Sequence, residues 1–279
     1  MSSKQYIPEL EEEWDEYWQK KSISEELELV KTDGLHPIFK QYLPKEGKIL
    51  EAGCGLGKWI ITLTHEGYQI EGVDSNSYAL DKLKHEFPGA QVRLGDVKHL
   101  DFEDESFKAY LSLGVVEHFE EGPDQALAEA HRVLKKDGIA IIEVPFDSPL
   151  RKLTRCWTGV MILLKTPIRL FLEIIGKRRP REKKKMRFYE YRYTIQELRS
   201  FVKEAGFSLI RMYPKDDLAK DRSISLWLDY PRLQSHSGRL FELNAWGRRI
   251  KNLLEAISPL TYCALIVAVA IKGKDQANT

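Results

Sequence analysis

The feature that most restricts the fold of this chain is a regular alternation of short β-branched runs with amphipathic helical stretches between residues 47 and 145. Five runs have the composition of strands: Lys48–Ala52, Tyr68–Asp74, Ala90–Gly95, Ala109–Leu113 and Ile139–Val144. The stretches with helical spacing between them are Lys58–Glu66, Ser77–Phe87 and Asp124–Lys136. Strands that alternate with helices form a parallel sheet covered by helices on both faces. The sequence therefore predicts a doubly wound α/β domain.

The α/β pattern stops after residue 147 and resumes near residue 193. Thr194 is placed to cap a helix that runs to about Ala205, and two further strands are expected at Phe207–Tyr213 and Tyr262–Lys272. Between them we expect a helix near Leu240–Ile257. The predicted division is an N-terminal helical segment (1–46), an α/β core (47–147), a helical basic insert (148–192), the rest of the core with a second helical insert (193–272) and a tail (273–279).

Composition excludes several classes of protein. The 279 residues include 43% hydrophobic and 30% charged residues, which excludes a chain disordered throughout, and the net charge of +1 predicts no partner by itself. Cys54, Cys156 and Cys263 lie far apart without metal-like spacing, so we expect reduced thiols in the cytoplasm. The acidic N-terminus does not have the pattern of a signal peptide, and neither long apolar stretch (157–176 and 263–271) is expected to cross a membrane.

The sharpest motif is a strand that ends in a glycine loop, Ile49-Leu-Glu-Ala-Gly-Cys-Gly-Leu-Gly57, with a helix expected from Lys58. Glycines let a backbone approach a ligand closely, and a helix N-terminus presents free N–H groups to it. The third glycine comes one residue earlier than in the dinucleotide fingerprint, and Lys58 stands where that glycine should be. The alternative is a tight strand-to-helix turn without a ligand.

With this loop, the chain resembles the class I S-adenosylmethionine-dependent methyltransferases, in particular the type 11 small-molecule group. The resemblance covers about residues 48–145 and the returning strands, and implies a seven-stranded Rossmann-like sheet whose last strand is antiparallel, with a helical lid insert after strand five. It implies S-adenosylmethionine as the cofactor. The positions that match the family's cofactor-binding motifs at the ends of the first four strands are Glu51, Gly53, Gly55, Gly57, Asp74, Ser75, Asp96, Val97, Leu113 and Gly114.

In this family the loop wraps the methionine part of the cofactor, the carboxylate at the position of Asp74 binds the ribose hydroxyls, and that at Asp96 accepts from the adenine amino group. A carboxylate can accept two hydroxyl hydrogen bonds, which accounts for the acidic type at Asp74. On its own, Asp74 could equally cap the helix that follows it.

His118 is the candidate general base, because it follows strand four near the expected position of the transferred methyl group. The alternative is that it only orients its loop. Some relatives hold a divalent metal through Glu-x-x-Glu-His at this point, but here Gly114 replaces the first Glu. We therefore predict no metal site.

The acceptor site is expected between the strand-four loop and the aromatic-basic run 187–193. Tyr189 and Tyr191 would supply an apolar wall, while Arg187 and Arg192 could pair with an anionic group of the substrate. The alternative is an edge strand whose two faces pack and solvate alternately. The predicted substrate is a small acceptor, hydrophobic, lipid-like or anionic, methylated on O or N.

The insert 151–186 is strongly basic, with twelve lysines or arginines and two glutamates. Ser148-Pro149 and Thr166-Pro167 resemble helix starts, which predicts helices at Pro149–Lys165 and Pro167–Ile175. Apolar residues beside a cationic cluster suit an anionic membrane surface, which would place the protein on the inner face of a membrane. The alternative is a lid packed on its own domain or on a second subunit of a homodimer.

Two other functions stay open from the sequence. A tRNA or RNA methyltransferase could use the basic insert to follow phosphates, although nucleic acid is not the expected partner. The Asn/Asp-Pro-Pro-Tyr motif of relatives that methylate the amino groups of DNA bases is absent, which argues against the exocyclic amino groups of bases as acceptors. A non-catalytic module could keep the fold and use the insert to bind a partner or a membrane. The intact glycines and both carboxylates favour the enzyme.

Overall fold

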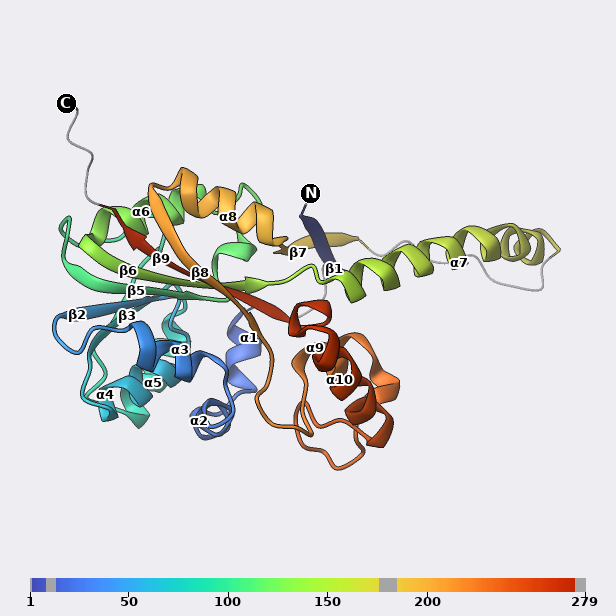
Figure 1. The fold of residues 1–279 in the computed structure, drawn as a ribbon, viewed down its shortest axis with the longest axis horizontal. Helices are drawn as coiled ribbons and strands as arrows, with labels where there is room; N and C mark the ends of the chain where they lie inside the picture. The colour runs from blue at the N-terminus through green and yellow to red at the C-terminus, as the bar shows by residue number, and fades with distance from the viewer. Residues whose placement is uncertain (1, 9–13, 176–184, 274–279) are drawn as a thin grey trace.

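The computed structural model describes residues 2–8, 14–175 and 185–273 (Figure 1). Its central sheet has seven strands in the order β4-β3-β2-β5-β6-β9-β8. The strands are β2 (Lys48–Ala52), β3 (Gln69–Asp74), β4 (Val92–Leu94), β5 (Phe107–Leu113), β6 (Leu134–Pro145), β8 (Phe207–Lys215) and β9 (Leu265–Lys272). Only β9 runs antiparallel, between β6 and β8. The predicted seven-stranded, mostly parallel sheet is confirmed.

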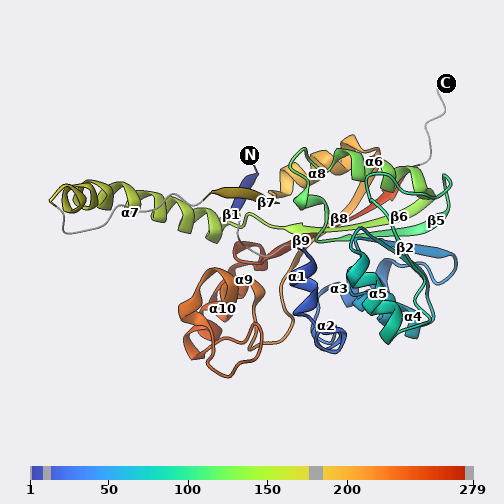
Figure 2. The ribbon, with the colours of Figure 1, turned by 180° about the vertical axis from the view of Figure 1, so that it is seen from behind.

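Helices cover both faces of this sheet, as Figures 1 and 2 show. One face carries α6 (Asp124–Val133) and α8 (Ile195–Glu204), and the other carries α3 (Leu35–Tyr42), α4 (Lys58–His65) and α5 (Ser77–Glu86). The capping prediction for α8 is confirmed, since Thr194 and Glu197 form a reciprocal capping box.

The two faces of the sheet have separate hydrophobic cores. Strand β6 contributes side chains to both of them, and this explains why it is apolar at successive positions. Ala140, Ile142 and Val144 pack with α6 and α8, whereas Ile141 packs with the helices of the opposite face. Successive side chains of a strand point to opposite faces, so a strand covered on both sides needs apolar residues throughout.

The N-terminal segment contains a strand in addition to the expected helices. The helices are α1 (Trp14–Gln19), α2 (Ile23–Val30) and α3. The strand, β1 (Ser3–Pro8), pairs antiparallel with β7 (Met186–Arg192) in a separate two-stranded sheet. Residues 187–192 therefore form a strand, as the alternative interpretation of the run 187–193 expected. The strand that pairs with it, β1, lies near the N-terminus of the chain.

The insert after β6 differs from expectation in two ways. A single helix, α7 (Pro149–Ile174), runs through Pro167 where two were expected. Ser148 does accept from the Arg151 N–H, but the Thr166 hydroxyl donates back to the Ile162 carbonyl at 2.7 Å instead of capping a new helix. In Figure 1, α7 extends away from the sheet, so its described part does not form the expected lid.

A small helical unit separates β8 from β9, as expected for the second insert. It contains α9 (Ile224–Asp229) and α10 (Ala245–Ile257), with short 3₁₀ turns at Pro231–Leu233 and Pro259–Thr261. Its own small core consists of Leu226, Leu243 and Tyr262, against which Leu150 of α7 packs. This contact joins the base of α7 to the unit.

Candidate active site

The glycine loop joins the end of β2 to the start of α4. The Gly53 N–H donates to the Val73 carbonyl at 2.7 Å, and the Gly55 N–H donates to Oδ2 of Asp74, also at 2.7 Å. Gly55 has a φ of 50°, and a Cβ there would lie 2.7 Å from the indole ring of Trp18. Both the backbone angle and the space under Trp18 therefore require glycine at this position.

Asp74 ends β3 and does not cap the next helix. The N-cap of α5 is Asn76, whose side chain accepts from the Ala79 N–H at 2.8 Å. The Asp74 carboxylate instead accepts from the backbone N–H groups of Gly55 and Asn76. Burial raises its pKa. The structure thus removes the capping interpretation and ties this carboxylate to the glycine loop.

Two adjoining cavities, of about 270 and 360 Å³, lie at the carboxyl ends of the first strands. Together they fall in the range of roughly 300–1,000 Å³ that is usual for small-molecule sites. They share Trp14, Trp18, Gly53, Gly114 and His118. Every predicted cofactor residue lines one or both of them: Glu51, Gly53, Gly55, Gly57, Asp74, Ser75, Asp96, Val97, Leu113 and Gly114.

Glu51 is a buried acid of the first cavity. Its side chain is 3% exposed, and among the described residues no group donates a hydrogen bond to Oε2. Burial raises its pKa to about 8, with a further rise from Asp74 and a partial offset from Lys58. A buried carboxylate oxygen without a donor is costly, so this position suits a ligand that brings its own positive charge.

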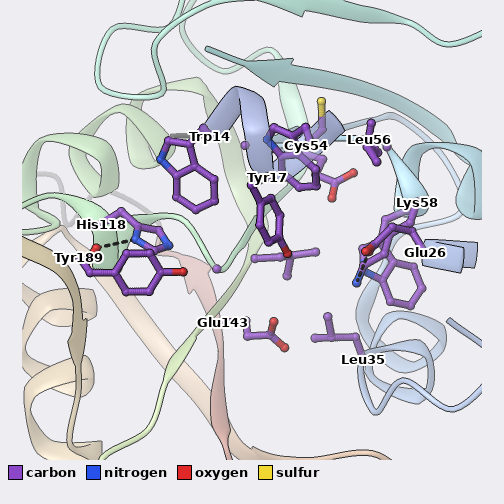
Figure 3. A pocket seen from close by; sticks show the side chains of 18 residues that line it. Trp14, Tyr17, Glu26, Leu35, Cys54, Leu56, Lys58, His118, Glu143 and Tyr189 are labelled. Atoms are coloured by element: carbon purple, nitrogen blue, oxygen red, sulfur yellow. Dashed lines mark hydrogen bonds and ion pairs between the residues drawn. The ribbon is translucent and has the colours of Figure 1, made fainter. Parts of the chain in front are cut away.

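His118 lines both cavities, and Figure 3 shows its ring in the first of them. Its Nδ1 is 2.7 Å from the backbone carbonyl oxygen of Tyr189. A carbonyl can only accept, so Nδ1 carries the hydrogen and donates it. Neutral His118 therefore keeps the lone pair on Nε2, which is the tautomer that a general base needs.

The wall opposite the glycine loop comes from α1, which the sequence analysis did not assign to the site. Trp14, Tyr17 and Trp18 all line the first cavity, and Trp14 also contacts the ring of His118 with centroids 5.0 Å apart (Figure 3). Burial, and then the charge of Glu26, raises the pKa of Tyr17 to about 12. Aromatic residues at spacings of three and four in an otherwise acidic segment are the signal that could have indicated an aromatic helix face.

A buried charge cluster borders the same cavity, and it was also missed. Lys215 of β8 lies 2.8 Å from Glu143 and 3.0 Å from Asp33, and all three side chains are less than a tenth exposed. The two carboxylates hold the pKa of Lys215 above its usual value, and Lys215 lowers that of Asp33 against the opposing effect of burial. Burial raises the pKa of Glu143. Glu143 is the member that lines the cavity.

The predicted acceptor residues are only partly brought together. Tyr189 lines the first cavity, whereas Tyr191 donates its hydroxyl hydrogen to the Glu120 carbonyl at 2.8 Å. Arg192 pairs with Glu190 and Asp229. Arg187 lies on β7 opposite Ile7 of β1, and neither arginine lines the two cavities.

The metal prediction concerns the turn at Val116–His118. Within the described ranges, no three His, Cys, Asp or Glu side chains are grouped so that they could hold a metal ion. Glu117 is buried there, and burial raises its pKa. The absence of a metal stays a prediction.

Comparison with known proteins gives a family match over the core of the chain. Residues 50–142 match the type 11 family described as "Methyltransferase domain". An uncharacterized methyltransferase, YodH of Bacillus subtilis, is 31% identical over 140 residues, which are 45% of this chain and 59% of the relative. A ubiquinone/menaquinone biosynthesis C-methyltransferase, UbiE of Campylobacter jejuni, is 29% identical over 113 residues, covering 38% of this chain and 47% of the relative. The chain thus spans about half the length of these relatives.

Solved structures match the fold over nearly the whole chain. A putative methyltransferase from Haloferax volcanii, solved in complex with the Trm112 methyltransferase activator, has a TM-score of 0.60 at 16% identity, over 95% of this chain and all of that chain. An S-adenosylmethionine-dependent methyltransferase from Archaeoglobus fulgidus has a TM-score of 0.56 at 15% identity, over 93% and 98% of the two chains. At these identities the match establishes the fold.

The residues around the cavities fit the cofactor of this family. Glu51 has an unpaired oxygen suited to the ammonium group of S-adenosylmethionine, and Asp74 and Asp96 line the second cavity where hydroxyl and amino donors would bind. The family match, the strand order and this geometry agree. Residues 50–142 form a class I methyltransferase domain of the type 11 group, whose cofactor is S-adenosylmethionine.

Proposed function

We propose that this protein transfers the methyl group of S-adenosylmethionine to an oxygen or nitrogen atom of a small acceptor with an apolar part. The observation that carries the proposal is the position of His118 where two cavities meet, one of which is lined by Glu51 and the other by Asp74 and Asp96. A catalytic group at that junction adjoins both the cofactor positions and the remaining space of the first cavity.

When bound, the cofactor supplies a methyl group that is already activated by its positive sulfur. The protein must therefore mainly hold the acceptor in line with it, and remove a proton where the acceptor is a hydroxyl or an ammonium group. The Tyr189 carbonyl fixes the tautomer of His118, so that Nε2 can take this proton. Trp14 and Trp18 line both cavities and supply apolar surface beside the acceptor.

The lining of the first cavity supports an acceptor that is apolar and not anionic. Tyr17, Tyr189 and Leu35 supply apolar surface, while Glu143 and Glu26 are acids. Lys58 is the basic side chain of this lining, and it lies 3.6 Å from Glu26. We therefore favour a hydrophobic or lipid-like acceptor with a neutral or cationic polar group over an anionic one.

The test has two stages that separate binding from activity. Isothermal titration with S-adenosylmethionine should give a single site, and no binding at millimolar cofactor would reject the enzyme. Incubation of bacterial lysate metabolites with labelled cofactor, followed by extraction into an organic solvent, should then label an apolar product. The His118→Gln variant should lose the label and keep cofactor affinity, and excess EDTA should leave labelling unchanged. Label confined to tRNA would favour the RNA methyltransferase.

A further inference from the structure

The part of α7 beyond its base is exposed around most of its circumference. From residue 152 to residue 167, Thr154 and Met161 are half-buried and all the other residues are exposed. Trp157 is 65% and Leu163 74% exposed, which is unusual for large apolar side chains. The helix has 26 residues, so it is about 39 Å long. A helix with this much uncovered apolar surface needs a partner.

The exposed apolar residues of α7 form a stripe along one side. At 3.6 residues per turn, the stripe occupies an arc of about 120°, and its members are Leu153, Trp157, Val160, Leu163 and Leu164. Ile162 lies outside the stripe. The rest of the circumference carries Lys152, Arg155 and Lys165 among small polar residues, and residues 149–167 contain no acid.

A second exposed apolar stripe lies on α10. Trp246, Ile250, Leu253 and Ile257 are spaced by four, three and four residues, so they share one side of the helix, and all four are exposed. Trp246 is 67% exposed, with the guanidinium of Arg249 5.3 Å from the ring centroid. The opposite side of α10 is anchored by Lys251, which is buried and donates to three backbone carbonyls.

Contacts with the α9–α10 unit hold the base of α7 at one end of the molecule (Figure 1). The Thr154 and Tyr230 hydroxyls are 2.6 Å apart, and Arg151 pairs with Asp229 at 2.6 Å. Leu150 packs into the core of the α9–α10 unit. The base of α7 is therefore fixed to the unit that carries the second stripe, on the side of the molecule away from α4 and α5.

The pattern of these helices fits the surface of a bilayer better than a protein partner or a passage through the membrane. No described helix is long and apolar enough to cross a membrane. Helices that lie in the interfacial plane combine an apolar side rich in Trp and Leu with a basic polar side, as α7 does. Arg155 pairs with Asp147 at 2.8 Å, so Lys152 and Lys165 supply the positive charge that would complement anionic headgroups.

We propose that this end of the protein docks on an anionic lipid bilayer, with the apolar stripe of α7, assisted by that of α10, buried in the interface. The docking surface consists of the two stripes and the basic residues of α7 named above. It goes beyond the proposed methyl transfer, because it concerns a surface that lines neither cavity.

The first test uses co-sedimentation of the full chain with vesicles of phosphatidylcholine and phosphatidylglycerol in equal parts. We expect binding at 50 mM salt that falls at least tenfold at 500 mM salt, and at least tenfold weaker binding to pure phosphatidylcholine. No binding to the mixed vesicles at 50 mM salt would overturn the proposal, as would equal binding to both compositions.

Charged substitutions then locate the surface. The Leu153→Glu/Leu163→Glu variant of α7 should bind at least tenfold more weakly, and Leu253→Glu of α10 severalfold more weakly. Ile210→Glu, at an exposed position on β8, is the matched control and should bind like the parent. All four positions are exposed, so cofactor affinity and melting temperature should not change. Parent-like vesicle binding by the double variant would refute the assignment.

Cys156 offers a direct probe of insertion, because it is exposed on α7 while Cys54 and Cys263 are buried. An environment-sensitive dye on Cys156 should become brighter and shift to the blue when anionic vesicles are added. If instead the dye responds to protein concentration without lipid, and the double variant converts a dimer to a monomer in sedimentation velocity, the surface binds a second copy and the membrane proposal is wrong.

Discussion

Glu51 makes cofactor binding depend on pH in a way that can be worked out from its surroundings. Its pKa of about 8 in the ligand-free protein means that it is mostly protonated at neutral pH. Binding an ammonium group beside it favours the ionised carboxylate, so the proton must leave when the cofactor binds. Replacement by Gln keeps the shape of the side chain and removes this titration.

The size of the effect follows from linkage. With a pKa of about 8, roughly one Glu51 in eleven is ionised at pH 7 and about one in a hundred at pH 6, so affinity should fall about tenfold between them. Near pH 8 and above, Glu51 becomes mostly ionised, so the affinity should level off there. At that pH the Glu51→Gln variant should lose about 1.5–3 kcal/mol, the usual scale for a charged hydrogen bond. Its deficit should shrink toward pH 6.

The measurement is isothermal titration with S-adenosylhomocysteine from pH 6 to pH 8, in two buffers with different ionisation enthalpies. The parent should release close to one proton per site at pH 7, and Glu51→Gln should release almost none. The matched ligand 5′-methylthioadenosine lacks the amino-acid portion, so its affinity should not depend on Glu51. A flat affinity for the parent between pH 6 and pH 8, or an equal slope for the variant, would refute this account.

The other predictions concern single contacts of the site and its surroundings. Asp74→Ala should cost about 1.5–3 kcal/mol of cofactor affinity in titration; unchanged affinity in a folded variant would show that Asp74 does not bind the ribose. Gly55→Ala places a methyl group 2.7 Å from the Trp18 ring at a φ of 50°, so it should destabilise the fold by about 1–2 kcal/mol for the backbone alone. Adding Trp18→Ala to the Gly55→Ala variant should restore only the stability lost to the clash with the ring, as measured by thermal denaturation. His118→Gln should lower kcat about 10²–10⁴-fold with the cofactor Kd within twofold; an unchanged kcat would remove it as the base. Lys215→Met leaves the buried carboxylates of Asp33 and Glu143 without their cation. It should lower the free energy of unfolding by about 3–5 kcal/mol, as measured by urea unfolding.

Most of the sheet could be predicted from local sequence, and the ten predicted cofactor positions all line the two cavities. Lys48–Ala52 was predicted to the residue, and the other core strands overlap their predicted ranges. A strand covered on both faces has to be apolar throughout, and that is visible in a window of a few residues. The carboxyl ends of parallel strands meet at one edge of a sheet, so placing each motif at a strand end was enough to bring Glu51, Asp74 and Asp96 to adjoining cavities.

What the sequence determined by itself is the alternation of strands and helices and the glycine turn between β2 and α4, since each depends on neighbours along the chain. The seven-stranded arrangement with an antiparallel last strand followed from the family resemblance. Only the tertiary structure decided that Trp14 and Trp18 cover the site in place of α7, that β1 pairs with β7, and that Lys215 joins Glu143 to Asp33. These contacts join residues between about 40 and 190 positions apart. Their energy comes from burial and charge pairing between segments whose local patterns fit several partners, so no short stretch of sequence specifies which one is chosen.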